Sequence, residues 1–183
     1  MSKPPSRADG EVVYVRQGEF AASGRDDVVL TAILGSCVAT CLYDESVGVG
    51  GMNHILLPHD VRGGAGSDLE TVNLMELLIN ELMKLGADRR RLKGKLFGGS
   101  SMMESSAQIG RMNAAFALEF LEAEGIPCIA QSLGGDSGRK IRFWPVGGRA
   151  RQFLLERQEV ETVIRPTPPP ARTAPAGDDI ELF

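Results

Sequence analysis

The chain is poor in the residues that most often build special sites. Its 183 residues include three cysteines, two histidines and one tryptophan. Three cysteines do not make a disulfide framework in a chain of this length, and a reducing cytosol keeps such thiols free. No apolar run approaches the roughly 18 residues that a membrane span needs, and the polar N-terminus does not resemble a signal peptide. These absences predict a cytoplasmic protein without membrane insertion.

A strong charge of one sign is also missing. The formal net charge is −4 and the pI is about 5.3, so no global basic field favours nucleic acid as a partner. The length and the 43% of hydrophobic residues fit one globular domain. We expect a disordered N-terminus at 1–10, the domain at 11–164, and at 165–183 a proline-rich disordered tail with an acidic, hydrophobic C-terminus. A docking peptide at that terminus is the alternative.

The hydrophobic periodicity predicts mostly strands, interrupted by two helices. We expect strands at 11–15, 28–34, 93–97, 126–133, 140–146 and 152–157, a hairpin of 38–43 with 47–57, a loop at 18–27, and helices at 67–86 and 106–125. The second helix is expected to pack through Ile109, Met112 and Phe116. This order of elements favours an α+β domain over a regularly alternating parallel α/β fold.

The predicted hairpin carries a candidate nucleophile and a candidate base. A cysteine attacks carbonyl carbon as a thiolate, so a thiol with an ordinary pKa of about 8.5 needs a base beside it. Cys37 follows Gly35-Ser36, a turn that exposes a side chain and presents N–H groups. If the hairpin turns between Glu45 and Ser46, Cys37 lies opposite His54, with Cβ atoms roughly 4.5 to 5.5 Å apart.

A cysteine and histidine pair also needs a third group that fixes the tautomer of the imidazole. Thr31 lies on the adjoining predicted strand, and its hydroxyl is the candidate; an ordinary strand threonine is the alternative. Cys41 and Cys128 lie in apolar runs, and we interpret both as small buried residues.

Zinc binding is a competing interpretation, because Cys37, Cys41, His54 and His59 have the spacing of a zinc finger. Pro58 stands between the histidines and would break the single helix on which a finger carries them. Two cysteines four residues apart on a strand are also about 13 Å apart, too far for one ion. We therefore expect no metal and no cofactor.

A second glycine-rich segment runs from Leu133 to Lys140 and contains Gly134, Gly135 and Arg139. Its amides are suited to holding an anion, although it does not match a Walker loop. A tight turn between strands is the simpler interpretation. The three residues remain candidates for lining a substrate groove.

Several spaced motifs resemble the CheD family of chemoreceptor glutamine deamidases. They are LGSCVATCLYD, GVGGMNHILLP, LINELMKLGA, KLFGG, IGRMN and LGGDSGRKIRF, and the similarity covers most of residues 12–157. The resemblance implies a cysteine hydrolase akin to the catalytic domain of cytotoxic necrotizing factor toxins, an α+β fold built as a layered α/β/β/α sandwich of mixed sheets. It assigns the nucleophile to Cys37, the general base to His54 and the orienting hydroxyl to Thr31.

The reaction implied by this resemblance converts glutamine side chains of methyl-accepting chemotaxis receptors to glutamate through a thioester. Backbone N–H groups around Ser36 and Cys37 are expected to stabilise the oxyanion. The implied partners are the receptors and a CheC-type phosphatase, and we expect a monomer. A non-catalytic adaptor for the same partners and a receptor methylesterase stay open as alternatives. Ser132 departs from the aspartate expected in the family, which puts the role of that acid in doubt.

Overall fold

A computed structural model describes residues 10–57, 66–102 and 104–155. These ranges contain nine strands, two α-helices and a short 3-10 helix: β1 (Glu11–Tyr14), β2 (Phe20–Ser23), β3 (Val28–Leu34), β4 (Val38–Asp44), β5 (Val49–Ile55), α1 (Gly66–Lys84), η1 (Arg89–Arg91), β6 (Lys93–Gly98), α2 (Glu104–Ala123), β7 (Cys128–Leu133), β8 (Gly138–Trp144) and β9 (Arg149–Leu155). The expected ends at 1–9 and 165–183 lie outside the described residues.

The strands form two mixed sheets. One has the order β1-β3-β8-β9 and the other the order β2-β5-β4-β6-β7. The pairs β1 with β3 and β6 with β7 are parallel, and all other pairs in the two sheets are antiparallel. The predicted α+β class with mixed sheets is therefore confirmed.

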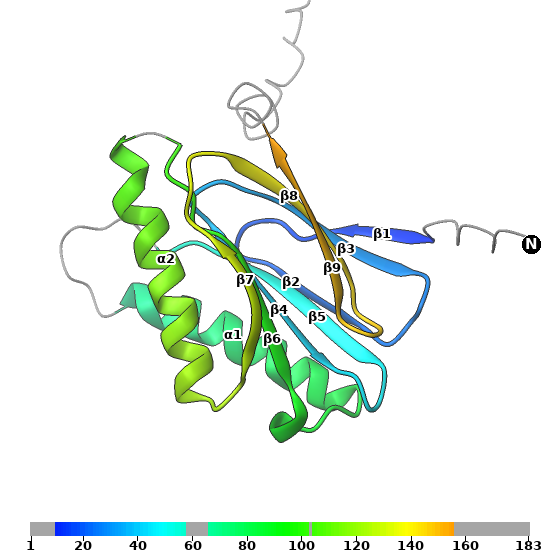
Figure 1. Ribbon diagram of the computed structural model, residues 1–183. Coiled ribbons are helices and arrows are strands. Elements are labelled where there is room, and N and C mark those ends of the chain that lie inside the picture. Colours follow the sequence, from blue (N-terminus) through cyan, green and yellow to red (C-terminus); the bar gives the residue numbers. More distant parts are fainter. Residues whose placement is uncertain (1–9, 58–65, 103, 156–183) are drawn as a thin grey trace, which may run out of the picture.

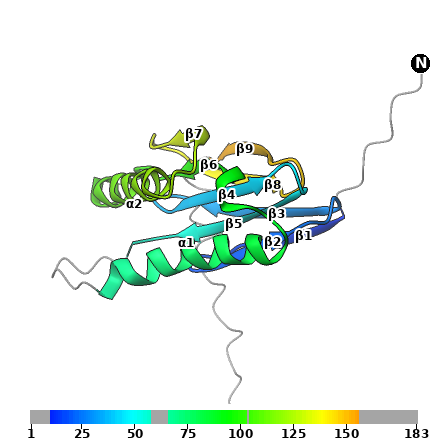
Figure 2. The ribbon, with the colours of Figure 1, turned by 90° about the horizontal axis from the view of Figure 1, so that it is seen from below.

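Both α-helices pack on the five-stranded sheet. Helix α1 contacts β2 and β5, and α2 contacts β4, β6 and β7, as Figures 1 and 2 show. The reason is connectivity: α1 joins β5 to β6, and α2 is the crossover that a parallel β6–β7 pair requires. Within the described residues the layers are thus α/β/β. The second helical layer of the predicted α/β/β/α sandwich is not among them.

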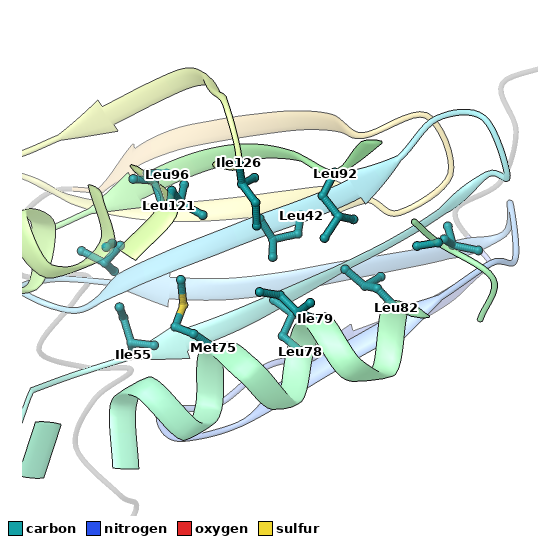
Figure 3. Packing of buried hydrophobic residues seen from close by; sticks show 14 residues of the cluster. Leu42, Ile55, Met75, Leu78, Ile79, Leu82, Leu92, Leu96, Leu121 and Ile126 are labelled. Atoms are coloured by element: carbon teal, nitrogen blue, oxygen red, sulfur yellow. The ribbon is translucent and has the colours of Figure 1, made fainter. Parts of the chain in front are cut away.

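One of two cores lies between the five-stranded sheet and the helices α1 and α2. Met75, Leu78, Ile79 and Leu82 are fully buried at the predicted spacing of three and four residues, and Figure 3 shows these side chains pointing toward the strands. Burying each such side chain contributes roughly 1.5 to 3 kcal/mol. The second core lies between the sheets and is formed largely by Leu30, Leu34, Ala39, Cys41, Met52, Ile141 and Phe143.

Strand β2 lies inside the segment that was predicted to be a loop. Its Ala21 and Ala22 have low strand propensity, but they pair with Met52 and Gly51 of β5. A Cβ atom at Gly51 would lie 2.7 Å from the Ala21 carbonyl oxygen and 2.6 Å from Leu78 Cδ1. The glycine lets β2 and α1 approach β5 closely, so tertiary packing forms this strand.

The predicted hairpin is confirmed, but its register differs from the expected one. His54 lies opposite Ala39, because the turn spans four residues, 45–48, with Gly48 at a φ of +66°. A shift of two residues keeps every side chain on its predicted face of the sheet. Cys37, which comes just before β4, packs against the core between the sheets, toward which His54 also points by alternation from Met52.

Candidate active site

Cys37 ends the turn that leads from β3 into β4, and this turn is held from three sides. Each of its carbonyl oxygens accepts at least one hydrogen bond: that of Gly35 from Ser100 N (2.9 Å) and Oγ (2.7 Å), that of Ser36 from Asn113 Nδ2 (2.7 Å), and that of Cys37 from Gly99 N (2.8 Å). The orientation of the three peptide groups is therefore fixed. This is the preorganisation that N–H donors of an oxyanion hole require.

Two glycines allow other elements to reach this turn. A Cβ atom at Gly98, whose φ is +117°, would lie 2.1 Å from the carbonyl oxygen of Cys37. A Cβ atom at Gly110 of α2 would lie 2.5 Å from the Gly99 oxygen. Only glycine fits at such close backbone contacts. The KLFGG and IGRMN motifs thus bring the end of β6 and the helix α2 against the candidate nucleophile.

The imidazole of His54 is buried, with 6% of the residue exposed, and only one of its nitrogens has a hydrogen-bond partner among the described residues. Nδ1 lies 3.1 Å from the carbonyl oxygen of Val15. A carbonyl only accepts, so Nδ1 carries the hydrogen and Nε2 keeps a free lone pair in the neutral ring. Nε2 is buried without a partner. His54 therefore has the tautomer of a base whose acting atom is Nε2.

The loop between β1 and β2 wraps around the backbone of the same histidine. Gly18 N donates to the His54 oxygen at 2.9 Å, and His54 N donates to the Glu19 oxygen at 3.0 Å. Val15 is itself held by a 2.9 Å bond from its N–H to the Thr31 carbonyl. The position of the base is thus set by β1, β3 and β5 together.

Thr31 has a different partner from the predicted one. Its hydroxyl donates to the Ile141 carbonyl oxygen at 2.7 Å, and no described hydrogen bond joins Thr31 to His54. The neighbouring Leu30 and Ala32 belong to the core between the sheets, so strand alternation points the Thr31 side chain to the opposite face of its sheet. The structure gives the orienting contact to the Val15 carbonyl instead, and a catalytic role for Thr31 stays a prediction.

Burial favours the neutral forms of the Cys37 thiol and the His54 imidazole. Burial raises the pKa of Cys37 to about 11 and lowers the pKa of His54 below its ordinary value. No hydrogen bond or ion pair in the described part of the chain joins the two residues. Sγ of Cys37 instead donates weakly to Oε1 of Gln17, at 3.8 Å.

The second glycine-rich turn lies against the nucleophile turn. Gly134 N donates to the Gly98 oxygen at 2.9 Å, and Ser101 N donates to the Gly135 oxygen at 2.8 Å. The structure thus brings Gly134 and Gly135 to the candidate site, as a substrate-lining role requires. Whether they contact substrate stays a prediction.

Arg139 is buried, and its side chain bonds groups of the protein itself. Only 4% of it is exposed, and its guanidinium donates to the carbonyl oxygens of Ser132 and Gly134 and, at 2.9 Å, to the Ser132 hydroxyl. Burial lowers the pKa of Arg139. Ser132, where an acid was expected, thus supplies a neutral partner for a buried cation. The arginine holds the turn, and its predicted contact with substrate remains untested.

The other cysteines lie apart from this chemistry. Cys41 is fully buried in the core between the sheets, as expected, and burial raises its pKa. The prediction that Cys128 is buried is wrong: it is half-buried at the start of β7, and its thiol contacts the Ala130 carbonyl at 3.4 Å. His59, the fourth residue of the zinc pattern, is outside the described residues. Within the described ranges, no three His, Cys, Asp or Glu residues are grouped to hold a metal ion.

Comparison with known proteins gives the family. A family model described as CheD chemotactic sensory transduction matches residues 69–152. The probable chemoreceptor glutamine deamidase CheD of Agrobacterium fabrum is 52% identical over 174 residues, which are 93% of this chain and 96% of that protein. The chain belongs to the CheD family. The CheD protein of the same description from Rhizobium meliloti is 47% identical and covers 97% of this chain and 99% of its own length.

Among solved structures, a Neisseria meningitidis protein of the DUF152 family aligns with a TM-score of 0.46 and 9% identity, over 69% of this chain and 65% of its own. No helix in the part of the chain that the structure describes is long and apolar enough to cross a membrane.

Asn113 is a residue of the candidate site that the apolar periodicity of helix α2 did not predict. Its Nδ2 donates to Ser36 and its Oδ1 accepts from Leu57 N at 2.8 Å, so one buried amide ties the nucleophile turn to the chain that follows the histidine strand. The periodicity placed Met112 on the packed face of the helix, but Met112 is 51% exposed and Asn113 is 0% exposed. The CheD motif IGRMN was the signal that contained it.

We expect Asn113→Ala to impair catalysis more than folding. The substitution removes the partner of the buried Leu57 N–H and of the part-buried Ser36 carbonyl, which costs about 2 kcal/mol of unfolding free energy. It also frees the turn that carries Cys37. Turnover per folded molecule should fall about tenfold or more. The matched control is Asn53→Ala, another fully buried amide, which bonds Thr40 N and not the nucleophile turn. Equal losses of turnover in the two variants would contradict a positioning role.

The neutral pair predicts a distinctive pH dependence. Because the pKa of Cys37 is about 11, its thiolate fraction grows throughout the neutral and mildly alkaline range. The rate of alkylation of Cys37 by iodoacetamide, followed on its own peptide, should rise about tenfold per pH unit from about pH 7 to 10. A rate that is already constant above about pH 6 would indicate a stable thiolate–imidazolium pair and would refute this account.

Proposed function

We propose that this protein deamidates glutamine side chains of methyl-accepting chemotaxis receptors, with Cys37 as nucleophile and His54 as general base. Two findings support the proposal. Relatives described as probable chemoreceptor glutamine deamidases match the chain over nearly its full length. The observation that carries the chemistry is the buried Nε2 of His54, which has no partner in the part of the chain that the structure describes and faces the same core as the Cys37 turn.

The first chemical step begins from the neutral thiol and neutral imidazole. A receptor carboxamide enters with its oxygen toward the N–H groups of Ser36 and Cys37. As the bond from Sγ to the amide carbon forms, the thiol proton moves to Nε2 of His54, and the carbonyl electrons move to the oxygen. Donors of this kind are each worth about 2.7 to 4 kcal/mol in other hydrolases. The Val15 carbonyl stabilises the imidazolium by accepting from Nδ1–H.

The second step expels ammonia. His54 passes the proton from Nε2 to the amide nitrogen, the carbon–nitrogen bond breaks, and a thioester on Cys37 remains. His54, neutral again, then takes a proton from water as it attacks the thioester. Glutamate leaves and the thiol is restored. Each turnover places one new negative charge on a receptor helix, which changes the repulsion between neighbouring helices.

For Thr31 we propose a positioning role through its backbone. Its carbonyl accepts from Val15 N, and the Val15 carbonyl orients His54. This path assigns the work of orienting the base to strand pairing between β1 and β3. The hydroxyl, which donates to the backbone carbonyl of Ile141, then contributes to stability.

We also propose that the enzyme is monomeric and cytoplasmic and that a CheC-type phosphatase is its second partner. We further propose that its fold is related to the catalytic domain of cytotoxic necrotizing factor toxins. The adaptor and methylesterase alternatives share the docking surface or the thioester, so the product of the reaction must separate them.

The decisive experiment incubates the protein with a chemoreceptor cytoplasmic fragment. We expect release of ammonia and, by mass spectrometry, the roughly one-dalton gain of amide-to-acid conversion at specific glutamines. Cys37→Ala should abolish both signals, and Cys128→Ala should retain them, because that thiol lies away from the turn. Methanol release in place of ammonia would establish the methylesterase, and receptor binding without any product would leave only the adaptor.

The role of Thr31 is tested by Thr31→Val, which keeps the side-chain shape and the carbonyl bonded to Val15. Loss of the bond to Ile141 should lower the unfolding free energy by about 1 kcal/mol, while kcat stays within about threefold because no contact with His54 is lost. Steady-state kinetics and thermal melting measure the two effects. A fall in kcat of a hundredfold with little loss of stability would restore the direct role of the hydroxyl.

A further inference from the structure

The side chain of Gln17, a glutamine of this chain, contacts Cys37, the proposed nucleophile. It stands at the apex of the turn between β1 and β2, between Val15, which orients His54, and Gly18, which bonds the His54 carbonyl. Gln17 is exposed, yet its side-chain oxygen Oε1 lies 3.8 Å from Sγ of Cys37. The structure thus places a primary carboxamide, the functional group of the proposed substrate, directly against the reactive sulfur.

The turn that carries Gln17 is well supported. Arg16 N donates to Glu19 Oε2 at 3.1 Å, and Glu19 N donates to the Arg16 oxygen at 2.9 Å. Together with the two bonds to the His54 backbone, these contacts hold the residues on both sides of Gln17. The carboxamide reaches Cys37 from a short, closed turn.

The orientation of this carboxamide is the reverse of a reactive one. For attack, the sulfur must approach the amide carbon to about 3 to 3.5 Å while the oxygen points to N–H donors. In the structure the oxygen of Gln17 points at the thiol and accepts from it. The contact therefore occupies the sulfur and directs its proton toward the carboxamide. It also gives no bond-forming geometry, so this arrangement does not lead to attack on the Gln17 carboxamide.

We propose that Gln17 is an internal pseudosubstrate. Its carboxamide fills the place that a receptor glutamine must take, and the receptor displaces it when its own carboxamide binds. This inference rests on the proposed function, since only a glutamine-directed enzyme gives the mimicry a meaning. Because the Gln17 side chain is exposed and its bond to Sγ is weak, its displacement costs little. Its effect is to protect the resting thiol and to raise KM.

The test measures the reactivity of Cys37 in the full-length protein with iodoacetamide, itself a small neutral carboxamide. Gln17→Ala should accelerate alkylation of Cys37 about two- to tenfold, as expected for loss of one hydrogen bond and its shielding, and should lower KM for the receptor with kcat nearly unchanged. Gln17→Glu places a carboxylate of the same shape beside the sulfur, disfavours thiolate and should slow alkylation about tenfold.

Arg16→Ala is the matched control, because it changes the neighbouring exposed side chain of the same turn and leaves the Gln17 carboxamide in place. In this variant, iodoacetamide should alkylate Cys37 at the wild-type rate. The intact mass of the wild-type chain should show glutamine retained at position 17. Alkylation rates that are equal in wild type, Gln17→Ala and Gln17→Glu would overturn the inference, as would glutamate found at position 17 in the wild type but not in Cys37→Ala.

These outcomes are separable from those that test the proposed function. Unchanged alkylation together with normal receptor deamidation refutes the pseudosubstrate and leaves the enzyme assignment intact. Absence of receptor deamidation in the wild type and in every variant refutes the enzyme assignment, and the pseudosubstrate with it, whatever the alkylation rates are.

Discussion

The hydrogen bond from His54 Nδ1 to the Val15 carbonyl is the contact on which the candidate chemistry depends. It decides that the unprotonated nitrogen of the ring is Nε2, the buried atom that has no partner within residues 10–57, 66–102 and 104–155. A backbone carbonyl carries no charge and cannot itself be protonated at ordinary pH, so it fixes the tautomer without forming an ion pair. Val15 is in turn fixed by Thr31, through the parallel pairing that extends β1 along β3. The four-stranded sheet thus orients the base, while the five-stranded sheet carries it.

The candidate nucleophile is held by the five-stranded sheet and by helix α2. The carbonyl groups of its turn are bonded by Ser100, Gly99 and Asn113, and the close backbone approach requires glycine at position 98. Base and nucleophile therefore belong to neighbouring segments of one hairpin but are positioned by different layers. Asn113 of helix α2 bonds the backbone of Ser36, next to Cys37, and of Leu57, three residues after His54. These two bonds explain why a helix that packs on the sheet matters to the site.

Much of this arrangement could be predicted from the sequence, and the parts that could not have physical reasons. The hairpin, both helices and most strands follow from apolar periodicity, and the family follows from spaced motifs. Strand β2 was missed because Ala21 and Ala22 become a strand only by pairing with β5. The register was missed by two residues because the turn is four residues long. Val15 was invisible to sequence reasoning since its contribution is a carbonyl, which every residue has, and Asn113 was hidden by the apolar Met112 beside it.

The resting state of the site favours selectivity over reactivity. A thiol whose pKa is raised to about 11 is almost wholly protonated at neutral pH, and so reacts slowly with chance electrophiles. Burial that lowers the pKa of His54 keeps the imidazole neutral and able to accept a proton. In the proposed mechanism, charge separation between sulfur and ring is then unfavourable until an oxyanion forms beside the turn's N–H groups and the imidazolium gains a nearby negative partner. A bound carboxamide is the group that supplies this charge, so the substrate itself completes the electrostatic environment in which the proton transfer becomes favourable.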